Sequence, residues 1–321
     1  MRSIPDVCEV QCVGPRANEP GTPATILIEV PHGATRARHF EAILERLASR
    51  LPEDLREFFF VNTDVGAFEC AERVAHLIVE PEADERLQAL LGEAADRIRK
   101  LPSRSVLIVR SLIPRTFIDC NRVLVPEPDG TEMTAALPAY IRSRTDVLEL
   151  TGLHDAYQAV AANGYRRVCG AGGTAIQLHT YAPREVQVDQ IDDDIVAVLR
   201  RAYDPENYAR WNERPDVDII SRDRDGRLLA SQRLVSAIRD CFARSGIESA
   251  ENVTYRLHPS ATGHRHSSTY PGRVVCVEIR RDRLADPFAP FEEMKIGSGK
   301  LAEMSAPLAA GCLLELIRGA R

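Results

Sequence analysis

Short apolar runs alternate with stretches of helical spacing along most of the chain. Residues 25–30 form a compact β-rich run that ends just before His32, and apolar residues recur at helical spacing from Arg36 onward. The same pattern predicts a strand over 58–61 and a helix over 68–78. Further strands are predicted over residues 105–109, 174–178 and 273–279, and further helices over about 82–100, 145–162, 192–203, 228–244 and 300–318.

Strands that alternate with helices predict an α/β fold, in which a mostly parallel or mixed central sheet is covered by helices on both faces. The 321 residues fit one large domain over 1–321. Within it, residues 1–24 are expected to form an N-terminal extension, and the charged stretch 81–101 is expected to be a helical insertion packed on the outside. Hydrophobic residues make up 44% of the chain, which is enough to form a large core.

The net charge of −6 indicates a small-molecule partner, because a nucleic-acid or anionic membrane surface would need a dominant basic patch. No apolar run approaches the roughly 18 residues that span a bilayer, and residues 1–10 lack the features of a signal peptide. We therefore expect a cytoplasmic protein whose eight dispersed cysteines are buried thiols. The sequence carries no signal for an oligomeric state.

Two histidines occupy equivalent positions at the ends of predicted strands. His32 follows the first apolar run, and His179 directly follows the run 174–178. The carboxyl ends of parallel strands converge, so two imidazoles there can bind one metal ion. Either histidine alone would fit a hydrogen-bonded structural role, but their pairing favours metal binding.

A catalytic zinc usually has three protein ligands, so a third donor is needed. Asp64 is the candidate, because it lies at the end of the predicted strand 58–61. The alternative is that Asp64 caps the helix that follows. Zinc is the expected ion, and Mn²⁺, Fe²⁺ or Co²⁺ also suit a site of histidine and carboxylate ligands.

The segment 115–122 concentrates groups that recognise carboxylates. Arg115 and Arg122 can form bidentate pairs with a carboxylate, Asn121 adds a directional donor, and Asp119 can orient one of the arginines. These residues predict a site for a small-molecule carboxylate substrate. The alternative is a salt-bridged loop brace.

Glu278 lies within an apolar strand, where an unpaired carboxylate is costly. Beside an activated water it would take the water's proton and pass it to the leaving nitrogen. The alternative pairs Glu278 with Arg280 in a structural salt bridge. Arg280 also begins an arginine cluster, which makes it a candidate substrate-binding residue.

Three histidines fall within residues 258–266, a stretch rich in glycine and serine. We interpret it as a loop that closes over substrate, with Gly263 and His264 as candidate contacts. A second metal site and a plain surface loop are the alternatives.

Taken in order, four motifs resemble the N-formylglutamate amidohydrolase family, which is related to zinc carboxypeptidases. They are Pro31-His32-Gly33, Asp119-Cys120-Asn121-Arg122, His179 and the run Val277-Glu278-Ile279-Arg280-Arg281-Asp282. The resemblance spans roughly residues 25–285 and implies a hydrolase-like, zinc exopeptidase-like form of the α/β fold.

The resemblance also implies a role for each matched residue. His32 and His179 would bind zinc, Arg115 would steady the oxyanion, Asn121 and Arg122 would hold the substrate carboxylate, and Glu278 would be the general base. Gly263 resembles, loosely, a glycine of a substrate loop. The chain departs from the carboxypeptidase pattern at Thr35, where that pattern has a glutamate ligand three residues after the first histidine. Asp64 is the inferred substitute.

These features predict a metal-dependent amidohydrolase that cleaves the amide bond of an N-formyl or N-acyl amino acid, with N-formylglutamate as the leading substrate. Two alternatives stay open. One is carboxypeptidase-like hydrolysis of a small peptide or biosynthetic conjugate, and the other is a non-catalytic carboxylate-binding module.

Overall fold

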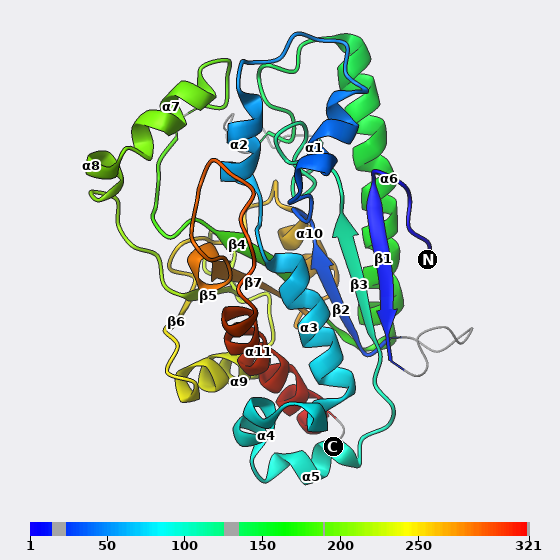
Figure 1. Ribbon diagram of the computed structural model, residues 1–321. Coiled ribbons are helices and arrows are strands. Elements are labelled where there is room, and N and C mark those ends of the chain that lie inside the picture. Colours follow the sequence, from blue (N-terminus) through cyan, green and yellow to red (C-terminus); the bar gives the residue numbers. More distant parts are fainter. Residues whose placement is uncertain (15–23, 125–134, 189, 320–321) are drawn as a thin grey trace.

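A seven-stranded mixed sheet in the order β1-β3-β2-β4-β7-β5-β6 organises the chain (Figure 1). The computed structural model describes residues 1–14, 24–124, 135–188 and 190–319. The strands are β1 (Cys8–Val13), β2 (Ile26–Val30), β3 (Val106–Ser111), β4 (Thr174–Tyr181), β5 (Val217–Ile220), β6 (Ser249–Glu251) and β7 (Val274–Arg280). The four central strands β3, β2, β4 and β7 are parallel, whereas β1 and β5 pair antiparallel with β3 and β7.

Helices cover both faces of the sheet. The α-helices are α1 (Ala37–Leu44), α2 (Leu55–Asn62), α3 (Ala67–Val79), α4 (Glu85–Leu91), α5 (Ala94–Arg99), α6 (Arg144–Val168), α7 (Ile195–Ala202), α8 (Pro205–Tyr208), α9 (Gln232–Arg244), α10 (Thr262–Thr269) and α11 (Ser298–Gly319). Short 3₁₀ turns are η1 (Pro81–Ala83), η3 (Cys169–Ala171) and η4 (Arg281–Arg283). The predicted α/β class, with a mixed central sheet and helices on both faces, is confirmed.

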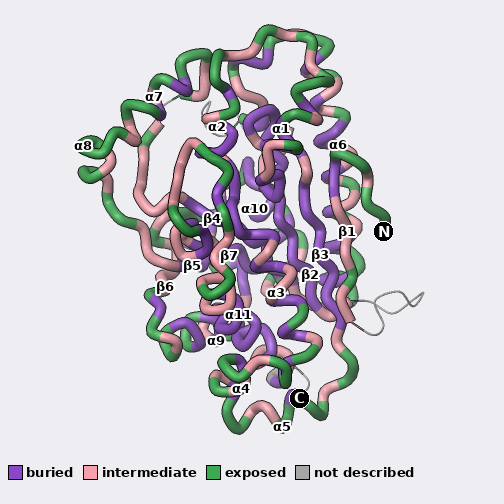
Figure 2. Tube along the Cα trace, viewed as in Figure 1, coloured by how far each residue is buried: buried purple, intermediate pink, exposed green. Residues whose placement is uncertain are grey.

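Alternation along the strands divides the core into two layers. Ile26 and Ile28 of β2 pack with α3, α9 and α11, whereas Leu27 between them packs on the opposite face with α6. The central strands are buried on both faces, as Figure 2 shows. Their sequences are therefore nearly continuous runs of apolar residues. Four of the five predicted strands are confirmed for this reason, as β2, β3, β4 and β7.

The strand predicted over 58–61 is wrong, because these residues lie within helix α2. The aromatic run is buried on every side, which removes the helical periodicity, and aromatic residues favour strands when neighbours are ignored. Residues 258–266 are likewise only partly a loop, because α10 begins at Thr262. Residues 8–13, inside the segment expected as an N-terminal extension, form the edge strand β1.

The two ends of the sheet carry different elements. Helices α1 and α2 lie beyond the carboxyl end of β2, whereas α4 and α5 lie at the opposite end, where they pack against α11 (Figure 1). The helices predicted within 81–101 are confirmed as α4 and α5. Among the described residues, no helix combines the length and apolar character needed to cross a membrane.

Candidate metal centre and substrate cavity

His32 and His179 meet where β2 and β4 approach their carboxyl ends. His32 lies two residues beyond β2, and His179 lies within β4, which continues past its predicted end to Tyr181. The two imidazole rings are 4.9 Å apart between centroids, and each side chain is buried. The structure therefore brings the two predicted ligands together at one edge of the sheet.

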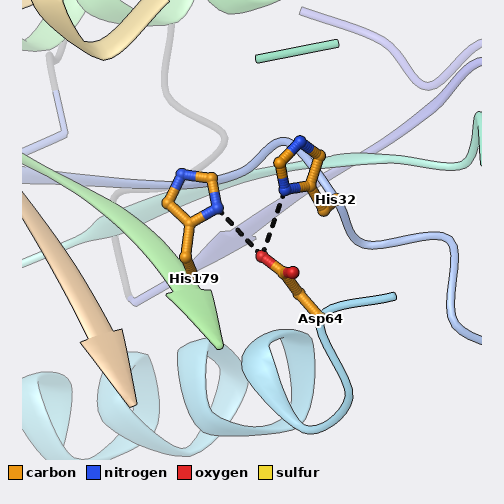
Figure 3. A group of neighbouring side chains, drawn as sticks. All are labelled: His32, Asp64 and His179. Atoms are coloured by element: carbon orange, nitrogen blue, oxygen red, sulfur yellow. Dashed lines mark hydrogen bonds and ion pairs between the residues drawn. The ribbon is translucent and has the colours of Figure 1, made fainter. Parts of the chain in front are cut away.

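Asp64 reaches the same point from the loop between α2 and α3 (Figure 3). Its Oδ2 lies 2.9 Å from His179 Nδ1 and 3.3 Å from His32 Nδ1. Asp64 was predicted to follow a strand, but it follows helix α2. Its side chain makes no capping hydrogen bond to α3, whose N-cap is Gly66. Asp64 therefore lies beside the two histidines, as predicted, but it belongs to a loop between two helices and does not follow a strand.

The three side chains fit a divalent cation. One ligand atom from each of His32, Asp64 and His179 lies within 4.8 Å of the other two, and two nitrogens with one carboxylate oxygen form a common donor set for zinc. The carboxylate is 1% exposed, so its charge is screened little by solvent. Thr35, where the carboxypeptidase pattern has a glutamate, is buried and its Oγ1 has no hydrogen-bond partner among the described residues.

Negative charge dominates the immediate surroundings of the two imidazoles. Burial alone would raise the pKa of Asp64, but His32 and His179 hold that pKa far below its ordinary value. Burial and Arg115 act to lower the pKa of His32, yet Asp119 and Asp64 together raise it above its ordinary value. The same field that favours a proton on His32 favours a cation between the three side chains.

Asp119 supports this arrangement from behind His32. Its Oδ1 lies 2.7 Å from His32 Nε2 and accepts from the backbone N–H of Asn121 at 2.7 Å, while its Oδ2 accepts from Arg115 Nη2 at 3.1 Å. Asp119 was predicted to orient an arginine, but its contact with His32 was not predicted. A carboxylate on Nε2–H leaves the lone pair of Nδ1 facing Asp64, which is the usual outer support of a metal-binding histidine.

Glu278 stands directly opposite His179 in the register of β7 and β4. No hydrogen bond to its carboxylate is found among the described residues, and burial raises its pKa to about 7 although His179, Arg214 and Arg115 act against this. Arg280 does not pair with it, because that guanidinium binds Asp282 at 2.9 Å through two nitrogens. A carboxylate with this pKa can accept and release a proton near neutral pH.

A cavity of about 430 Å³ opens beside these groups. Among the described residues that line it, six are arginines and three are carboxylates. The arginines are Arg115, Arg122, Arg184, Arg214, Arg256 and Arg281, and the carboxylates are Asp64, Asp119 and Glu278. This excess of cationic side chains favours an anionic ligand in a chain whose net charge is negative.

The cavity also has an apolar side. It is formed by α2, residues 135–138, three residues that precede α7, and α7 itself, through Phe58, Val61, Ala136, Leu137, Pro138, Val186, Val188, Ile191, Ile195 and Leu199. Arg281 connects this side to the metal site, because its Nη1 donates to the carbonyl oxygen of Val61 and its Nη2 lies 3.9 Å from Asp64 Oδ1. A ligand can therefore contact charged and apolar surfaces at once.

Of the other predicted site residues, Arg115, Asn121 and Arg122 line the cavity, whereas Arg280, Gly263 and His264 do not. Arg280 is directed away by Asp282 and lies 3.5 Å from Asp216. Gly263 and His264 belong to α10, and there is little space beside Gly263, because an added Cβ would lie 2.9 Å from Cys276 Sγ. The expected substrate loop is thus partly a packed helix.

Arg281 and Arg214 also line the cavity, although neither was predicted to do so. Arg281 belongs to the arginine cluster that begins at Arg280, but β7 ends at Arg280 and the turn η4 directs the next side chain toward the cavity. Arg214 lies outside any motif, with its guanidinium over the rings of Tyr181 and Tyr255. No sequence signal marks it.

Two solved structures share this fold over nearly the whole chain. An N-formylglutamate amidohydrolase from Ralstonia eutropha JMP134 aligns with a TM-score of 0.52 and 17% identity over 97% of this chain and 99% of that chain. A gene product from Agrobacterium tumefaciens aligns with a TM-score of 0.50 and 15% identity over 97% and 96%. No protein-family model and no curated protein sequence matches. The resemblance predicted from the motifs is confirmed at the level of the fold.

Proposed function

We propose that this chain is a divalent-metal-dependent amidohydrolase that removes an N-formyl or N-acyl group from an amino acid. The observation that carries the proposal is the position of Glu278, a carboxylate with a pKa near 7, directly opposite His179 in the strand register. The fold shared with an N-formylglutamate amidohydrolase supports the same reaction class.

His32, Asp64 and His179 would hold the ion, because their ligand atoms converge. When bound, the ion would act as a Lewis acid on the amide carbonyl oxygen and would make water a stronger nucleophile. Asp119 keeps His32 in the tautomer that presents Nδ1. Zinc is the expected ion, and manganese, iron or cobalt would suit the same donors.

Glu278 would take one proton from the attacking water and deliver it to the amide nitrogen as the C–N bond breaks. Arg115 would donate to the oxygen that gains negative charge, because its guanidinium is held by Asp119 at the cavity wall. The products are a carboxylic acid, which is formate from an N-formyl substrate, and the free amino acid.

The substrate's carboxylate would bind Asn121 and Arg122, which line the cavity beside the metal site. N-formylglutamate remains the leading substrate, since the further arginines can bind a second carboxylate. The apolar side of the cavity favours testing larger acyl groups as well, because a formyl group alone would not fill it.

A screen of N-formyl, N-acetyl and longer N-acyl amino acids with Zn²⁺, Mn²⁺ or Co²⁺ tests the proposal. Release of free amino acid that EDTA stops and added metal restores is the expected result. Faster cleavage of dipeptides would instead support the carboxypeptidase-like alternative. If wild type and Glu278→Gln are equally inert and both still bind dicarboxylates, the protein is a binding module and the proposal fails.

A further inference from the structure

A chain of buried hydrogen bonds connects the middle of the sheet to the cavity. It begins at Glu29 on β2, which is paired in register with Gln177 on β4. Gln177 Nε2 donates to Glu29 Oε2 at 2.9 Å and to Thr262 Oγ1 at 3.2 Å, and Thr262 Oγ1 donates to Asn121 Oδ1 at 2.7 Å. Glu29, Gln177 and Thr262 are each at most 1% exposed.

The carboxylate of Glu29, at the buried end, fixes which group donates and which accepts in each of these hydrogen bonds. The hydroxyls of Tyr157 and Tyr165 also donate to Glu29, at 2.9 and 2.7 Å. Burial and Glu29 raise the pKa of both tyrosines well above the ordinary value, so they keep their protons and remain donors. Glu29 therefore acts only as an acceptor, and the side-chain nitrogen of Gln177, not its oxygen, must face it.

The hydroxyl group of Thr262 links the orientation of the Gln177 amide to that of the Asn121 amide. Thr262 Oγ1 accepts from Gln177, so its own hydrogen is available for an acceptor on Asn121. If the amide of Asn121 were reversed, the hydroxyl hydrogen of the fully buried Thr262 would face an NH₂ group. Asn121 Oδ1 must therefore face Thr262, and Asn121 Nδ2 is left on the cavity side.

The same series of hydrogen bonds explains why residue 263 is a glycine. A Cβ at this position would collide with Oε1 of Gln177 and lie 2.9 Å from Cys276 Sγ. The absence of a side chain at Gly263 lets Gln177 remain between Glu29 and Thr262. Gly263 thus contributes to the site indirectly, by leaving room for Gln177, although it does not line the cavity.

We propose that Thr262 is a positioning residue that orients the side-chain amide of Asn121, so that its NH₂ group donates to the ligand carboxylate, with the orientation imposed by Glu29. Neither Thr262 nor Glu29 lines the cavity. Asn121 Nδ2 is 3.5 Å from His179 Nε2, at the outer limit of a hydrogen bond, so its hydrogens remain available to a ligand. This role in carboxylate binding rests on the proposed function.

The test compares four variants of the metal-loaded full chain. Thr262→Val removes the hydroxyl, Thr262→Ser retains it, and Glu29→Gln introduces a donor at the buried end. Thr269→Val is the matched control, because it removes a hydroxyl from the same helix that bonds only the backbone oxygen of Arg265. Thermal melting of each variant confirms folding.

Two readouts are measured on each variant. The first is the affinity for glutarate, a dicarboxylate that cannot be hydrolysed, together with KM and kcat for the best substrate. The second is the pair of side-chain amide NMR signals of Asn121, assigned by their loss in Asn121→Asp. The NMR readout does not depend on any activity, so it separates this proposal from the proposed function.

We expect Thr262→Val to weaken glutarate binding and raise KM by about three- to tenfold with little change in kcat, since one hydrogen bond made equally in ground and transition states is affected. Glu29→Gln should shift the Asn121 signals as Thr262→Val does, and Thr262→Ser and Thr269→Val should match wild type. Unchanged Asn121 signals or unchanged affinity in Thr262→Val overturns the proposal, as does equal loss in Thr262→Val and Thr262→Ser. If wild type binds no glutarate, the proposed function is weakened and the Asn121 signals alone decide.

Discussion

Glu29 and Glu278 occupy the same face of the same sheet, yet their surroundings differ completely. The pairings of Glu29 with Gln177 and of Glu278 with His179 are two residues apart along β4. Glu29 accepts hydrogen bonds from two tyrosines and a glutamine, whereas no donor to Glu278 is found among the described residues. Glu29 is fully buried and Glu278 is partly buried. The supply of hydrogen-bond donors distinguishes the structural glutamate from the proposed reactive one.

The largest difference should appear in catalysis. Glu278→Gln removes the proposed proton acceptor and should lower kcat by about 10²- to 10⁴-fold. Glu29→Gln, its matched control on the same sheet face, should leave kcat close to wild type, because Glu29 does not touch the reacting groups. Steady-state kinetics on the best substrate of the screen measures both. A comparable fall in kcat for Glu29→Gln would break the distinction.

The reverse difference should appear in stability. Glu29→Gln brings an NH₂ group among donors that need an acceptor, which should reduce the free energy of unfolding by about 1–3 kcal/mol. Glu278→Gln leaves no donor unpaired and should unfold at or above the wild-type denaturant concentration. Urea denaturation of the two variants decides the matter, and equal destabilisation would mean that Glu278 also has a structural role.

The pH dependence of kcat should report Glu278. As the proposed general base, Glu278 must be ionised to act, and its raised pKa keeps it protonated up to about pH 7. Activity should therefore fall about tenfold for each pH unit below that midpoint, and a bound cation should move the midpoint to lower pH. The residual activity of Glu278→Gln should lack this limb. A limb that persists in the variant would assign the titration to another group.

The smallest effect is expected at Arg280. Because Arg280 pairs with Asp282 and not with Glu278, Arg280→Gln should leave the acidic limb within about 0.3 pH units of wild type. KM should also change little, since Arg280 does not line the cavity. A clear shift of the acidic limb in Arg280→Gln would support the alternative in which Glu278 forms a salt bridge with Arg280.

The sequence identified those parts of the fold whose local pattern agrees with their environment. The central strands are apolar throughout because both faces are covered, so residues around Ile28 and Ile176 were predicted correctly. The strand β5 was missed because it has four residues and includes the polar Asp218, which accepts from the backbone N–H groups of Val253 and Thr254. Its pairing with β7 is a tertiary property that no local pattern records.

The candidate site was predictable where a side chain follows from strand geometry. His32, His179 and Glu278 lie on or directly beyond central strands, and parallel strands place such residues together. Asp64 was chosen from a mistaken strand, and it reaches the site only because the loop between α2 and α3 turns back toward the sheet. Arg214 and Thr262 depend on long-range packing and carry no sequence signal.

A calorimetric titration of the metal-free chain with Zn²⁺ measures metal binding by the group of His32, Asp64 and His179. We expect about one ion per chain for wild type. Asp64→Asn and His179→Ala should show no measurable binding, whereas Glu29→Gln should bind as wild type does. If wild type binds no Zn²⁺, or if Asp64→Asn and His179→Ala bind Zn²⁺ as tightly as wild type does, the metal site is not formed by these three side chains.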